Sequence, residues 1–171
     1  MIQQTPWFER KFDFNFPIGY FPVLLERLRG TLPQLEDLLK NIPEEILLSK
    51  IGQKWSVKEQ LGHLYDLEIL WYDRFEDFMN GKEILREADL TNRKTDEANH
   101  NKKTLHQLLQ LFFYERNKLV ERIKNIDEAT AVFTSIHPRL KKPMRLIDLL
   151  FFVAEHDDHH LAVIRTLINA A

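Results

Sequence analysis

Apolar residues recur every three or four positions along four long segments of this 171-residue chain, and only 5 residues are glycine. This spacing places the apolar side chains on one face of an α-helix. A helix with one apolar face needs partners that bury it, and four such helices bury one another as a bundle. The sequence therefore predicts an all-α fold, a four-helix bundle, as a single domain over residues 1–171.

The first and last helices are expected over residues 20–41 and 145–169. Gly30 and Pro33 should bend or split the first of these, because proline lacks an amide hydrogen and glycine is flexible. Between the third and fourth helices, Ile136 is compatible with a short extended piece, but nothing there indicates a full sheet.

Two capping boxes mark the starts of the second and third helices. Ser56 is followed by Glu59, and Thr104 by Gln107, so each pair of side chains can satisfy backbone amides at a helix start. The polar stretch 82–103 between these helices is too long for a tight hairpin. It therefore allows a long connection that crosses the bundle.

Two histidines lie inside the apolar face of the last helix. At about 100° per residue, His156 and His160 fall in the same stripe as Leu149, Val153 and Ile164. Their imidazoles lie one turn apart on one side, a spacing that suits two ligands of one metal ion.

A third histidine, His63, lies beside Leu67 at the margin of the apolar stripe of the second helix. Antiparallel or crossing packing would bring it opposite the His156/His160 pair and complete a three-histidine site with at least one open position. A histidine in this setting is more often a packed or hydrogen-bonded core residue, so spacing alone leaves both interpretations open.

Other metal motifs fit poorly. Asp157 follows His156, where a zincin has glutamate, and the one Glu-x-x-His motif, Glu97 to His100, lies in the polar connection. The remaining histidines are expected at the surface or supporting the ligands; they are His100, His106, His137 and His159.

Composition excludes several classes of function. The chain has no cysteine, hence no disulfide, thiolate zinc site or cysteine nucleophile. Its 24 basic and 26 acidic residues give a net charge of −2, so we expect neither a nucleic acid nor a membrane as partner. The basic cluster that contains Arg139 and Arg145 is interpreted as a solvated loop. With no signal peptide and no spanning segment, a cytoplasmic location is expected.

Three segments resemble the DinB/YfiT-like superfamily of metal-binding four-helix bundles. They are Trp55-Ser56-Val57-Lys58-Glu59 with Gly62-His63-Leu64 and Leu67-Glu68; residues 88–95 with Asn99-His100-Asn101; and Glu155-His156-Asp157-Asp158-His159-His160-Leu161. Carried over residue by residue, the resemblance implies that His63, His156 and His160 are the metal ligands. It also implies the crossover connection and a homodimer.

The sequence departs from the family at one point. Many members have Arg-Gly-Gln after the last histidine, where this chain has Leu161-Ala162-Val163. Contacts that those residues make to a substrate or thiol are therefore not expected here. Relatives in the family include thiol-dependent enzymes such as bacillithiol transferases and a mycothiol-dependent maleylpyruvate isomerase.

Three hypotheses for function follow. The leading one is a metal-dependent transferase that activates a low-molecular-weight thiol against a small-molecule substrate. The second is a metal-dependent hydrolase that activates water, and the third is a non-catalytic, metal-stabilised binding module. Zinc or nickel is expected, with iron or copper also compatible with histidine nitrogen. Asp66, Glu155 and Asp157 are candidates for orienting the ligands, and no catalytic acid or base is identified.

Overall fold

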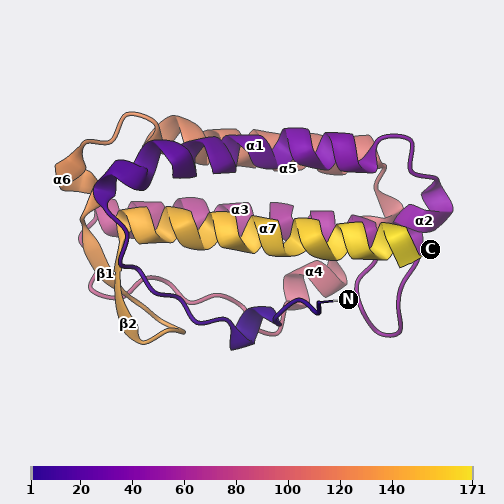
Figure 1. Cartoon of the computed structure of the whole chain (residues 1–171), viewed down its shortest axis with the longest axis horizontal. Coiled ribbons are helices and arrows are strands. Elements are labelled where there is room, and N and C mark those ends of the chain that lie inside the picture. The colour runs from indigo at the N-terminus through magenta and orange to yellow at the C-terminus, as the bar shows by residue number, and fades with distance from the viewer. Residues whose placement is uncertain (1, 171) are drawn as a thin grey trace.

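Four long helices dominate the computed structural model, which describes residues 2–170 (Figure 1). They are α1 (Phe21–Leu39), α3 (Val57–Met79), α5 (Leu105–Ile123) and α7 (Leu146–Ala170). The short elements are η1 (Trp7–Glu9), η2 (Ile18–Tyr20), α2 (Glu44–Leu48), α4 (Arg93–Glu97), η3 (His100–Lys102) and α6 (Glu128–Ala131). The predicted four-helix bundle is confirmed.

The helices are not packed in sequence order. α1 lies beside α5 and α7, and α3 lies beside the same two helices, so α1 is diagonal to α3 and α5 is diagonal to α7 (Figure 1). α1 and α7 run in one direction, and α3 and α5 run in the other. Helix α3 is therefore antiparallel to α7, its neighbour across the predicted histidine site.

The connection from α3 to α5 crosses back along the bundle, as predicted. Because these two helices are parallel neighbours, residues 80–104 must return from the end of α3 to its beginning (Figure 1). On the way, α4 and η3 pack against α3.

Both predicted capping boxes are present. The Ser56 hydroxyl accepts a hydrogen bond from the Glu59 amide at 3.2 Å, and the Glu59 carboxylate accepts one from the Ser56 amide at 2.8 Å. Thr104 and Gln107 repeat the arrangement at the start of α5. Gly81 follows the end of α3 with φ of +64°, a left-handed conformation that glycine adopts without strain.

The expected split of the first helix does not occur. α1 runs without interruption through Gly30 and Pro33. Proline removes one backbone hydrogen bond, but Leu28 and Leu35 on either side are fully buried. Their burial, about 2 kcal/mol for each side chain, offsets the missing bond and holds the helix together.

Between α6 and α7 the chain forms a two-stranded antiparallel hairpin of β1 (Thr134–His137) and β2 (Lys142–Arg145). Ile136 lies in β1, in agreement with the predicted extended piece, and also bridges to Ile84 in the crossover connection. The hairpin therefore ties the crossover connection to one end of the bundle (Figure 1).

The core consists of two apolar clusters. One gathers around Trp71, Phe75 and Phe152, and the other around Leu61, Phe112 and further residues toward the opposite end. Between these clusters the four helices contribute polar residues to the interior: Thr31, Glu68, Arg116, His156, Asp157 and His160. None of the helices within residues 2–170 is long and apolar enough to cross a membrane.

Candidate metal centre

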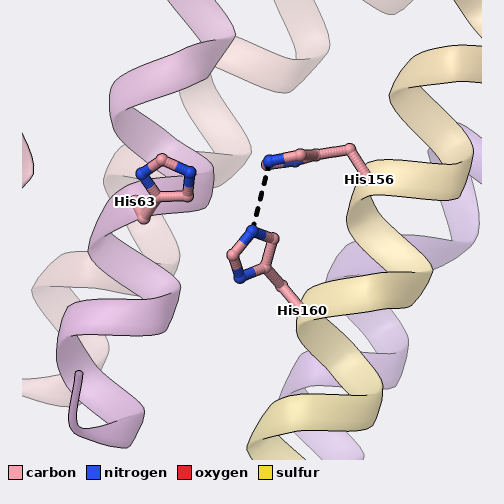
Figure 2. A group of neighbouring side chains, drawn as sticks. All are labelled: His63, His156 and His160. Atoms are coloured by element: carbon pink, nitrogen blue, oxygen red, sulfur yellow. Dashed lines mark hydrogen bonds between the residues drawn. The ribbon is translucent and has the colours of Figure 1, made fainter. Parts of the chain in front are cut away.

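The antiparallel packing of α3 and α7 brings the three predicted histidines together. His63 projects from α3, and His156 and His160 project from α7, toward a common point (Figure 2). One ring nitrogen of each histidine lies within 4.8 Å of the corresponding nitrogens of the other two. All three side chains are buried, with at most 7% of any residue exposed.

The closest approach is between the two histidines of α7. Their Nε2 atoms are 3.1 Å apart, and their ring centroids are separated by 4.4 Å. The ring centroid of His63 lies 4.9 Å from that of His160 and 5.4 Å from that of His156. Three imidazoles therefore surround one small volume.

Neighbouring side chains fix the orientation of His63. Its Nδ1 lies 3.0 Å from the hydroxyl of Thr95, and this hydroxyl donates to the Asp66 carboxylate at 2.9 Å. The hydroxyl must then accept from His63 Nδ1–H, which leaves the lone pair of His63 on Nε2. His100 Nε2 also lies 2.8 Å from the same Asp66 oxygen.

His160 is oriented in the same manner by Gln60, one turn before His63 on α3. Its Nδ1 donates to the Gln60 amide oxygen at 2.6 Å, which leaves the lone pair on Nε2. His156 Nδ1 is buried and has no hydrogen-bond partner within residues 2–170. Trp7 and Trp71 pack edge-on against the His156 ring, with centroids 5.0 and 5.6 Å away.

The imidazoles are neutral at physiological pH. Burial lowers the pKa of His63 to about 4. Burial, together with the neighbouring histidines, lowers the pKa of His156 and His160 well below the usual value. A neutral imidazole offers a lone pair, which is the form that binds a metal ion.

Gly62 permits the support of His63. A Cβ atom at this position would lie 2.2 to 2.6 Å from ring atoms of His100. Only glycine lets the His100 ring lie against α3 and reach Asp66. A glycine inside a helix, directly before a candidate ligand, is a signal of this close approach that the sequence offered.

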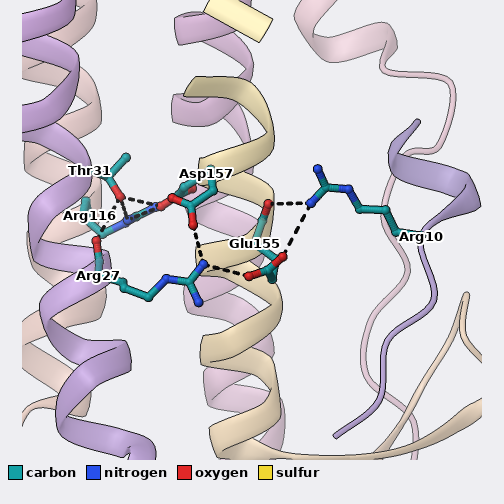
Figure 3. Close-up of polar contacts among 7 residues, drawn as sticks. Arg10, Arg27, Thr31, Arg116, Glu155 and Asp157 are labelled. Carbon is teal, nitrogen blue, oxygen red and sulfur yellow. Dashed lines mark hydrogen bonds and ion pairs between the residues drawn. The ribbon is translucent and has the colours of Figure 1, made fainter. Parts of the chain in front are cut away.

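Of the three predicted orienting acids, only Asp66 supports a ligand, and it does so through Thr95. Asp157 instead faces α1 and α5, where it accepts hydrogen bonds from Arg116 at 2.6 Å and from Thr31 at 2.8 Å (Figure 3). Consecutive helix residues point about 100° apart, so Asp157 cannot share the direction of His156.

The prediction for Glu155 is also wrong. Its carboxylate pairs with Arg27 at 2.8 Å and with Arg10 at 3.6 Å, on the side of α7 that faces α1 and the N-terminal segment (Figure 3). Sequence reasoning missed Thr95 and Gln60 as the groups that orient the ligands. No spacing rule links Thr95 in the crossover connection to a helix 32 residues earlier.

The other histidines are distributed as follows. His106 is exposed and His159 is half-buried, whereas His100 supports the site through Asp66. His137 is buried in β1 against Arg74, so a surface position is wrong for it.

A pocket of about 1440 Å³ opens onto the three histidines. The N-terminal segment, the loop before α3, the crossover connection and the β-hairpin turn all contribute to its walls. Trp7, Trp55 and Trp71 line it near the histidines, and Arg74 and Arg139 line it farther along.

The donor set fits a divalent metal ion. The two imidazoles with assigned protons present Nε2 lone pairs, and a cation can accept all three lone pairs at once. Hydrogen bonds from the outer nitrogens of His63 and His160 are the support that metal-binding histidines usually receive. The buried Nδ1 of His156 lacks such a support.

These features describe a class of protein: a crossover four-helix bundle with a buried three-histidine cluster at the base of a pocket. A family model for the DinB superfamily matches residues 27–164, which is most of the chain. The chain belongs to the DinB superfamily.

The structure is similar to that of YfiT from Bacillus subtilis, described as a probable metal-dependent hydrolase with an unusual four-helix bundle topology. The TM-score is 0.81, and the similarity covers 93% of this chain and 91% of the YfiT chain. At 17% sequence identity, it shows a shared fold. No curated protein matches the chain.

Proposed function

We propose that this chain is a metal-dependent enzyme that holds one divalent cation through His63, His156 and His160. The observation that carries the proposal is the convergence of three buried, neutral imidazoles, each with a nitrogen within 4.8 Å of the others. In the metal-free chain the Nε2 atoms of His156 and His160 share one hydrogen bond, whereas a cation would accept the lone pairs of all three imidazoles together.

The ligand chemistry favours zinc or nickel, and iron or copper also suit histidine nitrogen. A divalent cation held by three neutral imidazoles keeps its full charge and would supply Lewis acidity at the positions the protein leaves open. The residues around the cluster have separate tasks. Thr95 and Gln60 hold two of the rings, while Trp7 and Trp71 shield the third from water.

Hydrolysis of a small-molecule substrate is the reaction we propose first. The cluster faces a pocket instead of being closed by a fourth protein ligand among residues 2–170, which favours chemistry over a purely structural ion. The description of YfiT as a probable metal-dependent hydrolase supports the same reaction class.

Transfer to a low-molecular-weight thiol is the second candidate. The chain has no cysteine, so a reactive sulfur would have to arrive with a cosubstrate. The pocket of about 1440 Å³ exceeds the usual upper range for one small ligand, about 1,000 Å³. It therefore has room for a substrate and a cosubstrate.

Metal titration tests the site. Isothermal titration of the chelator-treated protein with zinc or nickel should give one tight site, which the His63→Ala, His156→Ala and His160→Ala variants lose. His106→Ala is the matched control, because His106 is exposed and lies outside the cluster. If wild type binds no stoichiometric metal, or if His106→Ala binds as poorly as the cluster variants, the proposed function is wrong.

Activity then separates the reactions. Metal-dependent cleavage of model esters or amides without thiol supports hydrolysis. Conjugation of a cell thiol to monochlorobimane that requires the metal supports transfer. A fully loaded protein that does neither, with a fourth ligand closing the sphere in a crystal structure, would assign the ion a stabilising role and refute catalysis.

A further inference from the structure

Two arginines that form no ion pair with an acidic residue of the described range 2–170 lie in the same pocket as the histidine cluster, farther along its wall. Arg74 comes from α3, three turns after His63, or roughly 16 Å along the helix axis. Arg139 comes from the turn between β1 and β2. Both line the pocket, and His137 lies between them.

Arg74 is a buried cation with little compensation. Only 2% of the residue is exposed; its Nε donates to the Arg86 carbonyl at 3.0 Å, and burial lowers its pKa to about 10. No carboxylate within residues 2–170 forms an ion pair with it. The nearby Asp77 accepts three hydrogen bonds from Arg86. By contrast, the other buried arginine, Arg116, pairs with two carboxylates.

Arg139 is also a partly buried cation whose hydrogen bonds are not all satisfied. One of its terminal nitrogens, Nη2, is buried and has no hydrogen-bond partner in the described chain. The guanidinium lies over the rings of Phe8, Phe152 and Trp7, at 5.3 to 5.9 Å from their centroids. Aromatic faces attract a cation, but they do not accept the hydrogen bonds that a guanidinium offers.

His137 adds a local excess of donors. Its Nδ1 lies 3.2 and 3.1 Å from the backbone amides of Arg139 and Leu140, and its Nε2 lies 3.2 Å from Arg74 Nη1. A neutral imidazole has one acceptor nitrogen, yet donors approach both nitrogens. Whichever nitrogen carries the proton, one N–H group at this end of the pocket lacks an acceptor.

Two guanidinium groups and a surplus N–H thus converge where no carboxylate among residues 2–170 forms an ion pair with either arginine, although Asp77 attracts Arg74 from a distance. The two carboxylates that also line the pocket, Glu87 and Asp89, are exposed and pair with neither arginine. An oxyanion would accept the unused hydrogen bonds and offset the repulsion between the two cations.

We propose that Arg74 and Arg139 form an oxyanion-binding subsite that receives a carboxylate or phosphate group of the molecule that reacts at the histidine cluster. The inference that this group belongs to the reacting molecule rests on the proposed function. Aromatic rings lie between the histidine cluster and the two arginines. Trp7 and Trp71 contact His156. The guanidinium of Arg74 lies over Trp71, and that of Arg139 lies over Trp7 and Phe152. The substrate class is therefore an anionic small molecule with an apolar or flat middle part.

Anion binding is measured on the chelator-treated protein, so that it does not depend on the metal. Inorganic phosphate and succinate are titrated by calorimetry, and the arginine Nε–H signals are followed by NMR. Arg139→Gln should weaken binding by about tenfold or more, the usual effect of losing a charge-assisted hydrogen bond. Arg122→Gln is the matched control, since Arg122 is exposed and pairs with Glu76 on the bundle surface.

Arg74→Gln should weaken binding as Arg139→Gln does, and its folding is checked by circular dichroism. Should the Arg74 variant not fold, Arg139→Gln still decides the question, because its side chain lies on a hairpin turn. Preference for phosphate over succinate, or the reverse, identifies which oxyanion the subsite takes.

The proposal is overturned if neither probe binds wild type saturably, or if Arg139→Gln binds as well as Arg122→Gln. It is also overturned if His156→Ala abolishes anion binding while Arg139→Gln retains it, because the anion would then lie at the histidines. Loss of metal binding with intact anion binding would refute only the proposed function. Intact metal binding without anion binding would refute only this inference.

Discussion

Replacing Arg116 with methionine should destabilise the bundle by about 3–5 kcal/mol at pH 8. Arg116 lies at the centre of the bundle, where its guanidinium makes five hydrogen bonds. Two go to Glu68 on α3, two to Leu28 and Thr31 on α1, and one to Asp157 on α7. One side chain of α5 thus joins all four helices, and methionine retains its bulk but none of its donors.

The magnitude follows from the two carboxyl groups left behind. Glu68 and Asp157 are each 1% exposed, so removal of Arg116 leaves two buried carboxyl groups without their cation, and breaking a buried ion pair in this way costs about 3–5 kcal/mol. Burial already raises the pKa of Glu68 to about 7 beside Arg116, and loss of the guanidinium, which lowers this pKa, raises it further.

The sign of the pH dependence is fixed by the same reasoning. In the variant, the folded-state pKa of Glu68 rises above its wild-type value of about 7, so above pH 7 the folded variant binds more protons than the folded wild type. The loss of stability relative to wild type should therefore be up to about 1.4 kcal/mol smaller at pH 6 than at pH 8, since the two proteins differ in proton binding above pH 7.

Urea unfolding followed by circular dichroism at pH 6, 7 and 8 measures this difference. Arg122→Met is the control, because Arg122 is half exposed and its pair with Glu76 contributes less than about 1 kcal/mol. A loss below about 1 kcal/mol for Arg116→Met at pH 8, or one that does not change with pH, would refute the reasoning.

Three further predictions concern the support of the histidine cluster. Thr95→Val removes the hydroxyl that orients His63, and zinc affinity, measured by chelator competition, should fall by about tenfold; unchanged affinity would contradict that role. Gly62→Ala should cost about 1–3 kcal/mol in urea unfolding, since the new methyl group would overlap the His100 ring; a neutral or stabilising effect would contradict the close approach. The third prediction concerns pH. Without metal, the stability of wild type relative to His63→Gln should decrease by up to about 1.4 kcal/mol per pH unit as pH falls from 6.5 toward 4, because the folded His63, with a pKa of about 4, takes up a proton less readily than the unfolded chain. A constant stability difference over this pH range would contradict the prediction.

The sequence predicted the features that local rules govern. Ser56 and Thr104 marked two helix starts because capping is a contact within four residues. The direction of His156 and His160 into the core followed from helical periodicity within one element. The length of the polar stretch 82–103 indicated the crossover, because a tight hairpin does not need so many residues.

Apart from the meeting of His63 with His156 and His160, features that depend on contacts between distant segments were not predicted. Thr95 reaches His63 only because the crossover connection lies against α3, and no local pattern encodes that register. Arg139 was interpreted as part of a solvated loop, whereas the hairpin and the N-terminal segment bury one of its nitrogens among aromatic rings. Charge and spacing in a sequence do not reveal which cationic side chains the fold buries.

The order of the helices has a consequence for biosynthesis. The main helical neighbours of α1 are α5 and α7, which follow it by more than 60 and 100 residues, and not α3, the next long helix in the chain. A nascent chain that leaves the ribosome therefore presents the leucine-rich face of α1 without a native cover until almost all of the domain has been synthesised. Compared with bundles made of consecutive hairpins, this protein should fold late and slowly for its helical content, and it should depend more on chaperones during translation.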